Sequence, residues 1–223
     1  MLIYYCFFCF FLRFRIDFLV IFHPFGCSLH HTFKYIGVGN YLLLSVEDGH
    51  VRKRLHIDIP DVWDKSCEKA HQLFYDYVKF ILTRTNRYTK KKYKDDPAIM
   101  SWQIGNEPRA FSKEQLPAFE KWLGEASKLI RSLDKNHLIS IGSEGKWGCE
   151  GELNCWGRIC ADKNVDYCNI HLWPYNWSWA RKDHLQEDLG ISCKNTKEYI
   201  DEHLEVCGRI RKPLVMEEFG YPR

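Results

Sequence analysis

Apolar residues follow a helical period in one part of the chain and form a short continuous run in the next. Between residues 73 and 82 they recur at spacings that place them on one helical face, namely Leu73, Phe74, Tyr77, Val78, Ile81 and Leu82. The apolar segment Ala98–Ile104 follows and is bounded by Pro97 and Gly105, as is typical of a buried strand. The pattern therefore predicts a helix and then a strand.

The same alternation continues to the end of the chain. Ser112 and Gln115 are spaced as a capping box, which predicts the start of a helix that runs to a turn at Asp134. Four strands separated by helix-length connections imply parallel pairing and an α/β fold. Tyr41–Ser45 is a further candidate strand. The remaining predicted elements are a strand at His137–Gly142, a short helix around Leu153–Ala161, a strand at Asp166–Trp173, a long helical stretch at Asp183–Arg211 and a last strand at Pro213–Glu218.

Polar side chains occur at the carboxyl end of each of the four clear strands. In a parallel barrel these ends face one mouth, where active sites are built. A doubly wound open sheet also binds ligands there, but no glycine-rich phosphate-binding turn follows any of these strands. The pattern favours an α/β fold of the (β/α)8 TIM barrel type, which takes about 250 residues, so we expect it to be incomplete at both ends. The polar residues are Asn106 and Glu107, Ser143 and Glu144, His171, and Glu217 and Glu218.

Two carboxylates at one barrel mouth are what cleavage of a glycosidic bond requires. One must be protonated to assist the leaving oxygen, and the other must be ionised to attack the anomeric carbon. Glu107 and Glu218 fit these roles. For either residue alone, an ion pair with an arginine or lysine is the alternative interpretation.

Two segments closely resemble strands of glycoside hydrolase family 5: WQIGNEPR at residues 102–109 and PLVMEEFG at residues 213–220. HLWPYNW at residues 171–177 resembles a third strand. The nearest likeness within the family is to its endo-β-1,4-mannanases, whose strand before the acid/base resembles DPAIMSWQIGNEPR. The resemblance covers Phe74 to Arg223 and implies a retaining hydrolase of β-1,4-mannosidic bonds in mannan-type polysaccharides. A β-1,4-glucanase of the same family and a non-catalytic, carbohydrate-binding remnant are the alternatives.

The resemblance also implies roles for individual residues. Glu107 resembles the acid/base, and Asn106 resembles the residue that hydrogen-bonds the sugar's 2-hydroxyl. Glu218 is implied as the nucleophile rather than Glu217, because the family's nucleophile directly precedes an aromatic–glycine pair, here Phe219–Gly220. Neighbouring side chains of a strand alternate between its faces, so we expect Glu217 on the opposite face.

His171 resembles the family's substrate-side histidine. Trp173 occupies a position where many members carry a tyrosine that hydrogen-bonds the nucleophile, and an indole can only donate through its N–H. The family also has an arginine on an early strand and a tryptophan on the last strand. Neither of these two residues has an identifiable counterpart in this sequence.

Four further residues are candidate substrate contacts. Trp147 and Trp177 follow strand ends and would offer flat faces to sugar rings, although aromatic side chains also fill protein cores. Arg109 and Glu144 are placed as polar sugar contacts, or else each is half of a structural ion pair.

Composition narrows the class of protein. The 223 residues, 45% hydrophobic and 15% aromatic, can bury one sizeable core. The net charge of +3 comes from 32 basic and 29 acidic residues spread along the chain, which leaves no electrostatic footprint for nucleic acid or an anionic membrane. We therefore expect a polysaccharide substrate as the partner, no nucleic acid, and a monomer when the barrel is complete.

Ten cysteines are many for a cytosolic protein and suit a secreted one. Disulfides and buried thiols are both compatible with this count. The cysteines are not repeated at zinc-ribbon spacing, so no metal site is expected. Nothing in the sequence points to a cofactor.

The start of the chain is apolar but differs from the rest. Neither Met1–Leu12 nor Phe18–Phe22 reaches the roughly 18 to 20 apolar residues that span a bilayer, so no membrane span is expected. A signal-peptide core and a misassembled upstream exon are both open explanations. We expect residues 1–60 to be a poorly matched N-terminal segment, residues 61–223 to be a partial catalytic domain, and the protein to be extracellular.

Overall fold

The computed structural model of the chain describes residues 68–222. The N-terminal segment 1–60, with its candidate signal sequence and the candidate strand Tyr41–Ser45, lies outside these residues. Four of the cysteines lie outside them as well, namely Cys6, Cys9, Cys27 and Cys67.

Helices and strands alternate through the described part of the chain, as the sequence predicts. The α-helices and strands are α4 (Glu68–Thr83), β1 (Ser101–Gln103), α5 (Leu116–Leu133), β2 (Leu138–Ser140), α6 (Leu153–Ala161), β3 (Cys168–Leu172), α7 (Leu189–Ile210) and β4 (Leu214–Phe219). Two 3-10 helices, η3 (Tyr93–Asp95) and η4 (Lys146–Cys149), lie in the connections. In residues 68–222 no helix is long and apolar enough to cross a bilayer.

Two predicted helix starts are wrong, each for a local reason. Gln115 has helical backbone angles, α5 begins after it, and no side chain caps the helix, so the predicted capping box is absent. A helix starting at Ser112 would carry Pro117 in its interior, where the missing N–H breaks a hydrogen bond; the later start leaves Pro117 in the first turn. Helix α7 begins at Leu189 because Asp188 accepts hydrogen bonds from the backbone and guanidinium of Arg181, which holds the preceding residues in a loop.

The four strands are parallel and follow one another in chain order. β1 pairs with β2, and β3 pairs with β4. β2 is joined to β3 by the Asp166 N–H, which donates to Ile139 O at 2.8 Å, and by the His171 N–H, which donates to Glu144 O at 3.3 Å. A doubly wound sheet reverses its strand order, whereas a barrel does not. Successive βα units in this order form an arc of a barrel wall.

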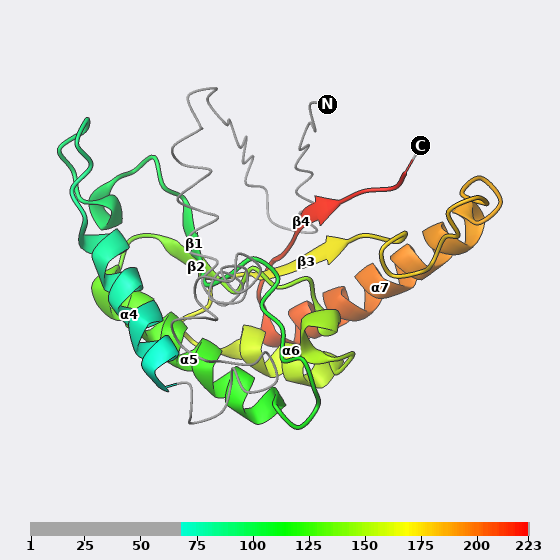
Figure 1. Cartoon of the computed structure of the whole chain (residues 1–223), viewed down its shortest axis with the longest axis horizontal. Helices are drawn as coiled ribbons and strands as arrows, with labels where there is room; N and C mark the ends of the chain where they lie inside the picture. The colour runs from blue at the N-terminus through cyan, green and yellow to red at the C-terminus, as the bar shows by residue number, and fades with distance from the viewer. Residues whose placement is uncertain (1–67, 223) are drawn as a thin grey trace.

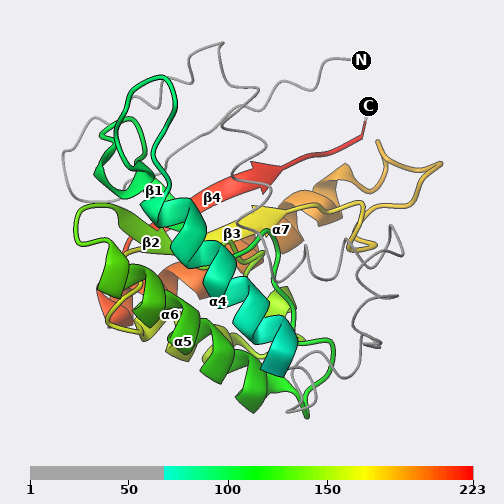
Figure 2. The ribbon, with the colours of Figure 1, turned by 60° about the vertical axis from the view of Figure 1, so that its left-hand side comes forward.

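The helices cover one side of this arc. Figure 1 shows α4, α5, α6 and α7 together on the same side of the strands, and Figure 2 shows α4 and α5 running side by side. Each helix packs against the next one along the chain. The core lies between helices and strands, where Phe74, Trp102, Leu123, Ile139 and Trp156 are almost fully buried. The other side of the arc is therefore left for polar side chains.

The six cysteines of the described residues are unpaired, and all except Cys193 are buried. Buried thiols rather than disulfides are thus the correct interpretation for this part of the chain. The five buried thiols add to the apolar core between the helices and the strands.

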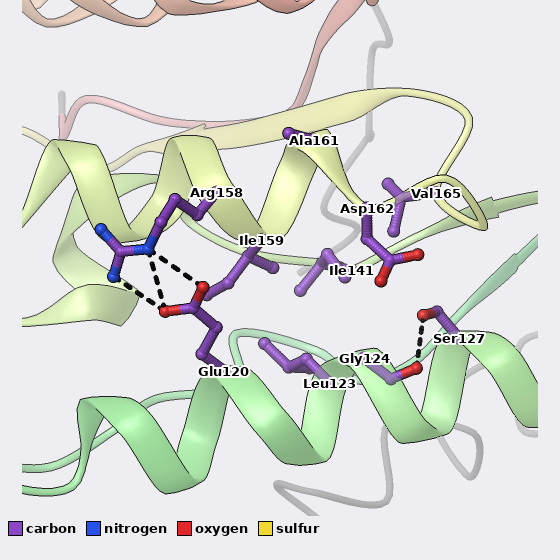
Figure 3. A pocket seen from close by; sticks show the side chains of 10 residues that line it. All are labelled: Glu120, Leu123, Gly124, Ser127, Ile141, Arg158, Ile159, Ala161, Asp162 and Val165. Atoms are coloured by element: carbon purple, nitrogen blue, oxygen red, sulfur yellow. Dashed lines mark hydrogen bonds and ion pairs between the residues drawn. The ribbon is translucent and has the colours of Figure 1, made fainter.

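A cavity of about 260 Å³ lies between α5 and α6. Figure 3 shows the Glu120–Arg158 ion pair at one end and Asp162 and Ser127 at the other. Gly124 lines the cavity from α5, and a Cβ added there would lie 3.7 Å from Asp162 Oδ2, an ordinary contact. The position has space for a methyl group.

We expect Gly124→Ala to stabilise the protein by about 1 kcal/mol, because alanine has the higher helix propensity and fits the space. For a chain of this size the melting temperature should rise by roughly 2 to 4 °C in a thermal unfolding experiment. Gly142→Ala is the opposing control, since Gly142 has φ 77° and an added Cβ would lie 1.7 Å from the carbonyl oxygen of Gly105. A lower melting temperature for Gly124→Ala would contradict the packing described.

Candidate active site

The backbone after β1 carries Glu107 to the carboxyl-terminal edge of the sheet. The Gly105 N–H donates to Ile141 O at 3.1 Å, and the Glu107 N–H donates to Gly142 O at 2.8 Å, so the pairing with the β2 segment continues past both strands. Glu107 itself has a φ of 49°, in the left-handed region that non-glycine residues seldom adopt. Such backbone strain is typical of functional positions.

A β-bulge in β4 turns two consecutive carboxylates toward the same histidine. Ile170 pairs with Met216 and His171 pairs with Glu218, which leaves Glu217 as the extra residue. Glu217 Oε2 lies 3.8 Å from His171 Nε2, and Glu218 Oε2 lies 3.4 Å from His171 Nδ1. The prediction that Glu217 lies on the opposite face is therefore wrong, because a bulge interrupts the alternation on which it depended.

His171 lies between the two predicted catalytic carboxylates. Its Nδ1 is 2.7 Å from Glu107 Oε1. One ring nitrogen of His171, one oxygen of Glu107 and one oxygen of Glu218 all lie within 4.8 Å of one another. Retaining glycosidases hold their two carboxyl groups about 5 to 5.5 Å apart, whereas inverting enzymes leave room for a water molecule between them. The two carboxylates of this chain thus converge on one histidine nitrogen.

Opposing effects set the protonation of His171, whose side chain is 2% exposed. Burial alone lowers the pKa of the ring, but the hydrogen bond to Glu107 and the nearby carboxylates of Glu217 and Glu218 outweigh it and raise the pKa to about 10. The ring is then protonated at neutral pH. An imidazolium has no lone pair for a metal ion, so this cluster of donors suits proton transfer better than metal binding.

Trp173 contacts the predicted nucleophile as its position in the sequence suggests. Its indole N–H donates to Glu218 Oε2 at 3.1 Å, the hydrogen bond that many family members are expected to make with a tyrosine. Gly220 gives the indole its space, since a Cβ there would lie 2.3 Å from a ring carbon of Trp173.

Arg109 and Glu144 pair with each other by a hydrogen bond between their side chains. Glu144 is buried, and burial raises the pKa of its carboxyl group, while Arg109 opposes that rise. The ion-pair interpretation of both residues is thus correct, and their contact with sugar stays a prediction. Asn106 is exposed beside Glu107, where a substrate hydroxyl could reach it.

Trp147 and Trp177 lie in one aromatic cluster with Trp179 and Tyr199. Trp147 stacks on Tyr199 with ring centroids 6.5 Å apart, and Trp177 lies 5.0 Å from Trp179 and 5.1 Å from Tyr199. Both tryptophans are partly exposed. They pack as core residues on one side and keep some surface for a ligand, so the role of sugar platform stays a prediction for both.

Sequence reasoning missed three residues whose side chains hydrogen-bond to Glu217 or to the backbone of Glu144. Gln103 and Asn169 donate to Glu217, and the Tyr199 hydroxyl donates to Glu144 O at 2.6 Å. Gln103 and Asn169 are polar residues within apolar strands, which is a signal for a buried polar network. Asn169 is also two residues from His171, the spacing of side chains on one face of a strand.

The fold and the site together define the class of the protein: βα units of a parallel barrel with two carboxylates converging at the carboxyl ends of its strands, the arrangement of barrel glycoside hydrolases. The chain belongs to glycoside hydrolase family 5, since the family model described as "GH family 5 beta-mannosidase-like" matches residues 63–223.

Known relatives agree with this membership. Mannan endo-1,4-beta-mannosidase 1 of Arabidopsis thaliana is 32% identical over 180 residues, covering 74% of this chain and 42% of that protein. Mannan endo-1,4-beta-mannosidase 4 of Solanum lycopersicum is 34% identical over 152 residues, covering 64% of this chain and 37% of that protein. The chain therefore spans about two fifths of the length of these relatives.

Solved structures show the same architecture. A glycoside hydrolase family 5 mannosidase from Rhizomucor miehei superimposes with a TM-score of 0.61 at 30% identity, over 72% of this chain and 36% of that one. The endo-beta-1,4-mannanase from Thermotoga petrophila superimposes with a TM-score of 0.60 at 28% identity, over 74% of this chain and 37% of that one. The (β/α)8 barrel predicted from the sequence is thereby confirmed, with four of its strands and four of its helices in the described residues.

The neutral ring of His203 hydrogen-bonds to the backbone at Lys146, near Trp147. Its protonation should therefore make the free energy of unfolding depend on pH. Its Nε2 accepts the Lys146 N–H at 3.0 Å, and its Nδ1 donates to Tyr199 O at 2.7 Å. Burial lowers the pKa of His203 to about 4, and the charge of Lys146 acts in the same direction. Because the unfolded chain binds this proton near pH 6.5, stability is retained above that pH and is lost as the pH falls toward 4.

We expect the free energy of unfolding in urea to fall by roughly 3 kcal/mol between pH 6.5 and 4 on account of this histidine. His203→Gln, measured over the same pH range, should flatten that slope even though it destabilises the fold. His184→Gln, at an exposed histidine, should leave the slope unchanged. An equal slope in the parent and in His203→Gln would exclude His203 as its cause.

Proposed function

We propose that the protein is a retaining endo-β-1,4-mannanase, with Glu218 as nucleophile and Glu107 as acid/base. The observation that carries the proposal is the convergence of Glu107, His171 and Glu218, whose facing atoms lie within 4.8 Å of one another. A pair of carboxylates at this spacing suits attack on an anomeric carbon from one side and protonation of the leaving oxygen from the other.

The reaction then proceeds in two steps. In the first, the Glu218 carboxylate forms a bond to the anomeric carbon while Glu107 gives its proton to the glycosidic oxygen, which leaves as a hydroxyl. In the second, the Glu107 carboxylate takes a proton from water, the water oxygen bonds the anomeric carbon, and Glu218 is released as a carboxylate. The Trp173 N–H, 3.1 Å from Glu218 Oε2, orients the carboxylate for attack.

The choice of mannan rests on the relatives and on the exposed positions around the pair. The matched relatives carry the name mannan endo-1,4-beta-mannosidase. Mannan differs from cellulose in the configuration at C2, and Asn106 beside Glu107 is the exposed amide that would contact the hydroxyl on that carbon. Trp147 and Trp177 would stack on sugar rings farther along the polymer, and the paired Arg109 and Glu144 would contact sugar hydroxyls.

We also propose that the protein acts outside the cell, where a polymeric substrate is accessible, and that it is a monomer. Expression with a C-terminal tag, followed by detection of the tag in the medium and in the cell fraction, tests the first. Sizing of the purified protein by light scattering tests the second. Retention of all the protein within cells would overturn the extracellular location. A particle larger than one chain would overturn the monomer.

Purified protein should release reducing ends from galactomannan faster than from carboxymethylcellulose. Glu218→Ala should abolish this activity, because no nucleophile remains. Glu107→Gln should reduce it by roughly 10²- to 10⁴-fold, the contribution typical of general acid–base catalysis. NMR of the first products should show retained configuration at the anomeric carbon.

Glu120→Gln is the matched control, since Glu120 pairs with Arg158 on the helical side of the fold. This variant should keep the parent rate. Equal rates for Glu218→Ala and the parent would remove Glu218 from the mechanism, inverted products would exclude the covalent route, and a preference for carboxymethylcellulose would replace mannan by a β-1,4-glucan.

A further inference from the structure

Glu217 is a largely covered acidic group that the two-step mechanism does not use. Its side chain is 10% exposed. Gln103 Nε2 donates to its Oε1 at 2.5 Å, and Asn169 Nδ2 donates to its Oε2 at 2.8 Å. The two amides belong to β1 and β3, and Glu217 belongs to β4, so three strands fix the position of one carboxylate.

This carboxylate faces the side of His171 that is turned away from the reacting pair. Glu217 Oε2 lies 3.8 Å from His171 Nε2, while Glu107 and Glu218 lie on the Nδ1 side at 2.7 and 3.4 Å. A neutral imidazole carries one N–H and one lone pair, so it can face a carboxylate favourably with only one of its nitrogens. Carboxylates at both nitrogens match the imidazolium, which has two N–H groups.

The other charged groups around the ring do not change this balance. Glu144, which contributes the backbone oxygen bonded to the His171 N–H, adds a further negative charge near the ring, and Arg109 is paired with that carboxylate. Glu107 carries the proton before the first step and Glu144 is paired with Arg109, so Glu217 and Glu218 are the negative charges that face the ring. Both favour a protonated ring.

We propose that Glu217 is a positioning residue that holds His171 as an imidazolium, with the Nδ1–H directed at Glu107 and Glu218. The proposal deepens the proposed function, on which its consequence for catalysis rests. Glu217 does not touch the reacting atoms. It acts on them through His171, whose charge lies beside whichever of the two catalytic carboxylates is ionised at each step.

This arrangement has a direct chemical use. When Glu107 gives up its proton in the first step, a negative charge appears 2.7 Å from His171 Nδ1, and a charged N–H donor stabilises it better than a neutral one. The raised pKa of His171, about 10, agrees with this assignment.

The test follows the protonation of the His171 ring by NMR in the full chain labelled with ¹⁵N-histidine. His171→Gln identifies its signals by their disappearance. In the parent the ring should stay protonated past pH 8. In Glu217→Gln, which keeps the size of the side chain and removes its charge, the titration midpoint should fall by roughly 1 to 3 pH units, the effect of one opposite charge at this range.

Two further variants separate this effect from a general disturbance. Glu217→Asp keeps the charge, and its midpoint should lie between those of Glu217→Gln and the parent. Glu120→Gln removes a charge far from the ring and should leave the midpoint unchanged.

A neutral His171 ring at pH 7 in the parent would overturn the proposal without any variant, so the test holds even if Glu217→Gln does not fold. An unchanged midpoint in Glu217→Gln would overturn it as well. The NMR measurement requires no turnover. A shifted midpoint in a protein that does not hydrolyse mannan would thus reject the proposed function and leave the role of Glu217 intact.

Discussion

The hydrogen bond between Gln103 and Glu217 joins the first and the last of the four described strands, which form two two-stranded sheets linked by the backbone hydrogen bonds between the β2 and β3 segments. β1 and β4 have β2 and β3 between them, so in a flat sheet they would lie about 14 Å apart. A side-chain contact of 2.5 Å between them requires a strongly curved sheet whose polar face is concave. The same curvature brings Glu107, which follows β1, to Glu218 in β4. The short distance between Glu107 and Glu218 thus depends on the curvature of the barrel wall and on the length of these two side chains.

Concentrating carboxylates on a concave surface has a cost, because like charges at short range repel and burial disfavours each of them. The fold offsets this cost with donors placed on neighbouring strands. His171 lies between Glu107 and Glu218, Trp173 donates to Glu218, and the amides of Gln103 and Asn169 donate to Glu217. The network is shared among β1, β3 and β4, so each strand depends on the others for a satisfied polar interior.

The order of helices and strands was predictable from the sequence because apolar periodicity is a local property. Helix α6 has the predicted bounds, and the predicted apolar face of α4 is buried or half-buried except at Leu73, which is 49% exposed. The start of α7 was not predictable, since it depends on the side-chain contact between Arg181 and Asp188. The pairing of Arg109 with Glu144 was one of two open alternatives, because their segments meet only after β1 and β2 are placed side by side. Local patterns predict elements, and contacts between elements need the fold.

The bulge in β4 shows how far one local irregularity can alter the chemistry of a site. Val215 pairs with Asn169, whose amide faces the polar network, so regular alternation from Val215 would direct Glu217 inward and Glu218 outward. The nucleophile predicted by family resemblance would then point away from the substrate. One extra residue between Met216 and Glu218 directs both carboxylates inward, Glu218 toward the Nδ1 side of His171 and Glu217 toward its Nε2 side. Glu218 can therefore face Glu107 only because β4 has the bulge, and the same bulge leaves Glu217 beside His171.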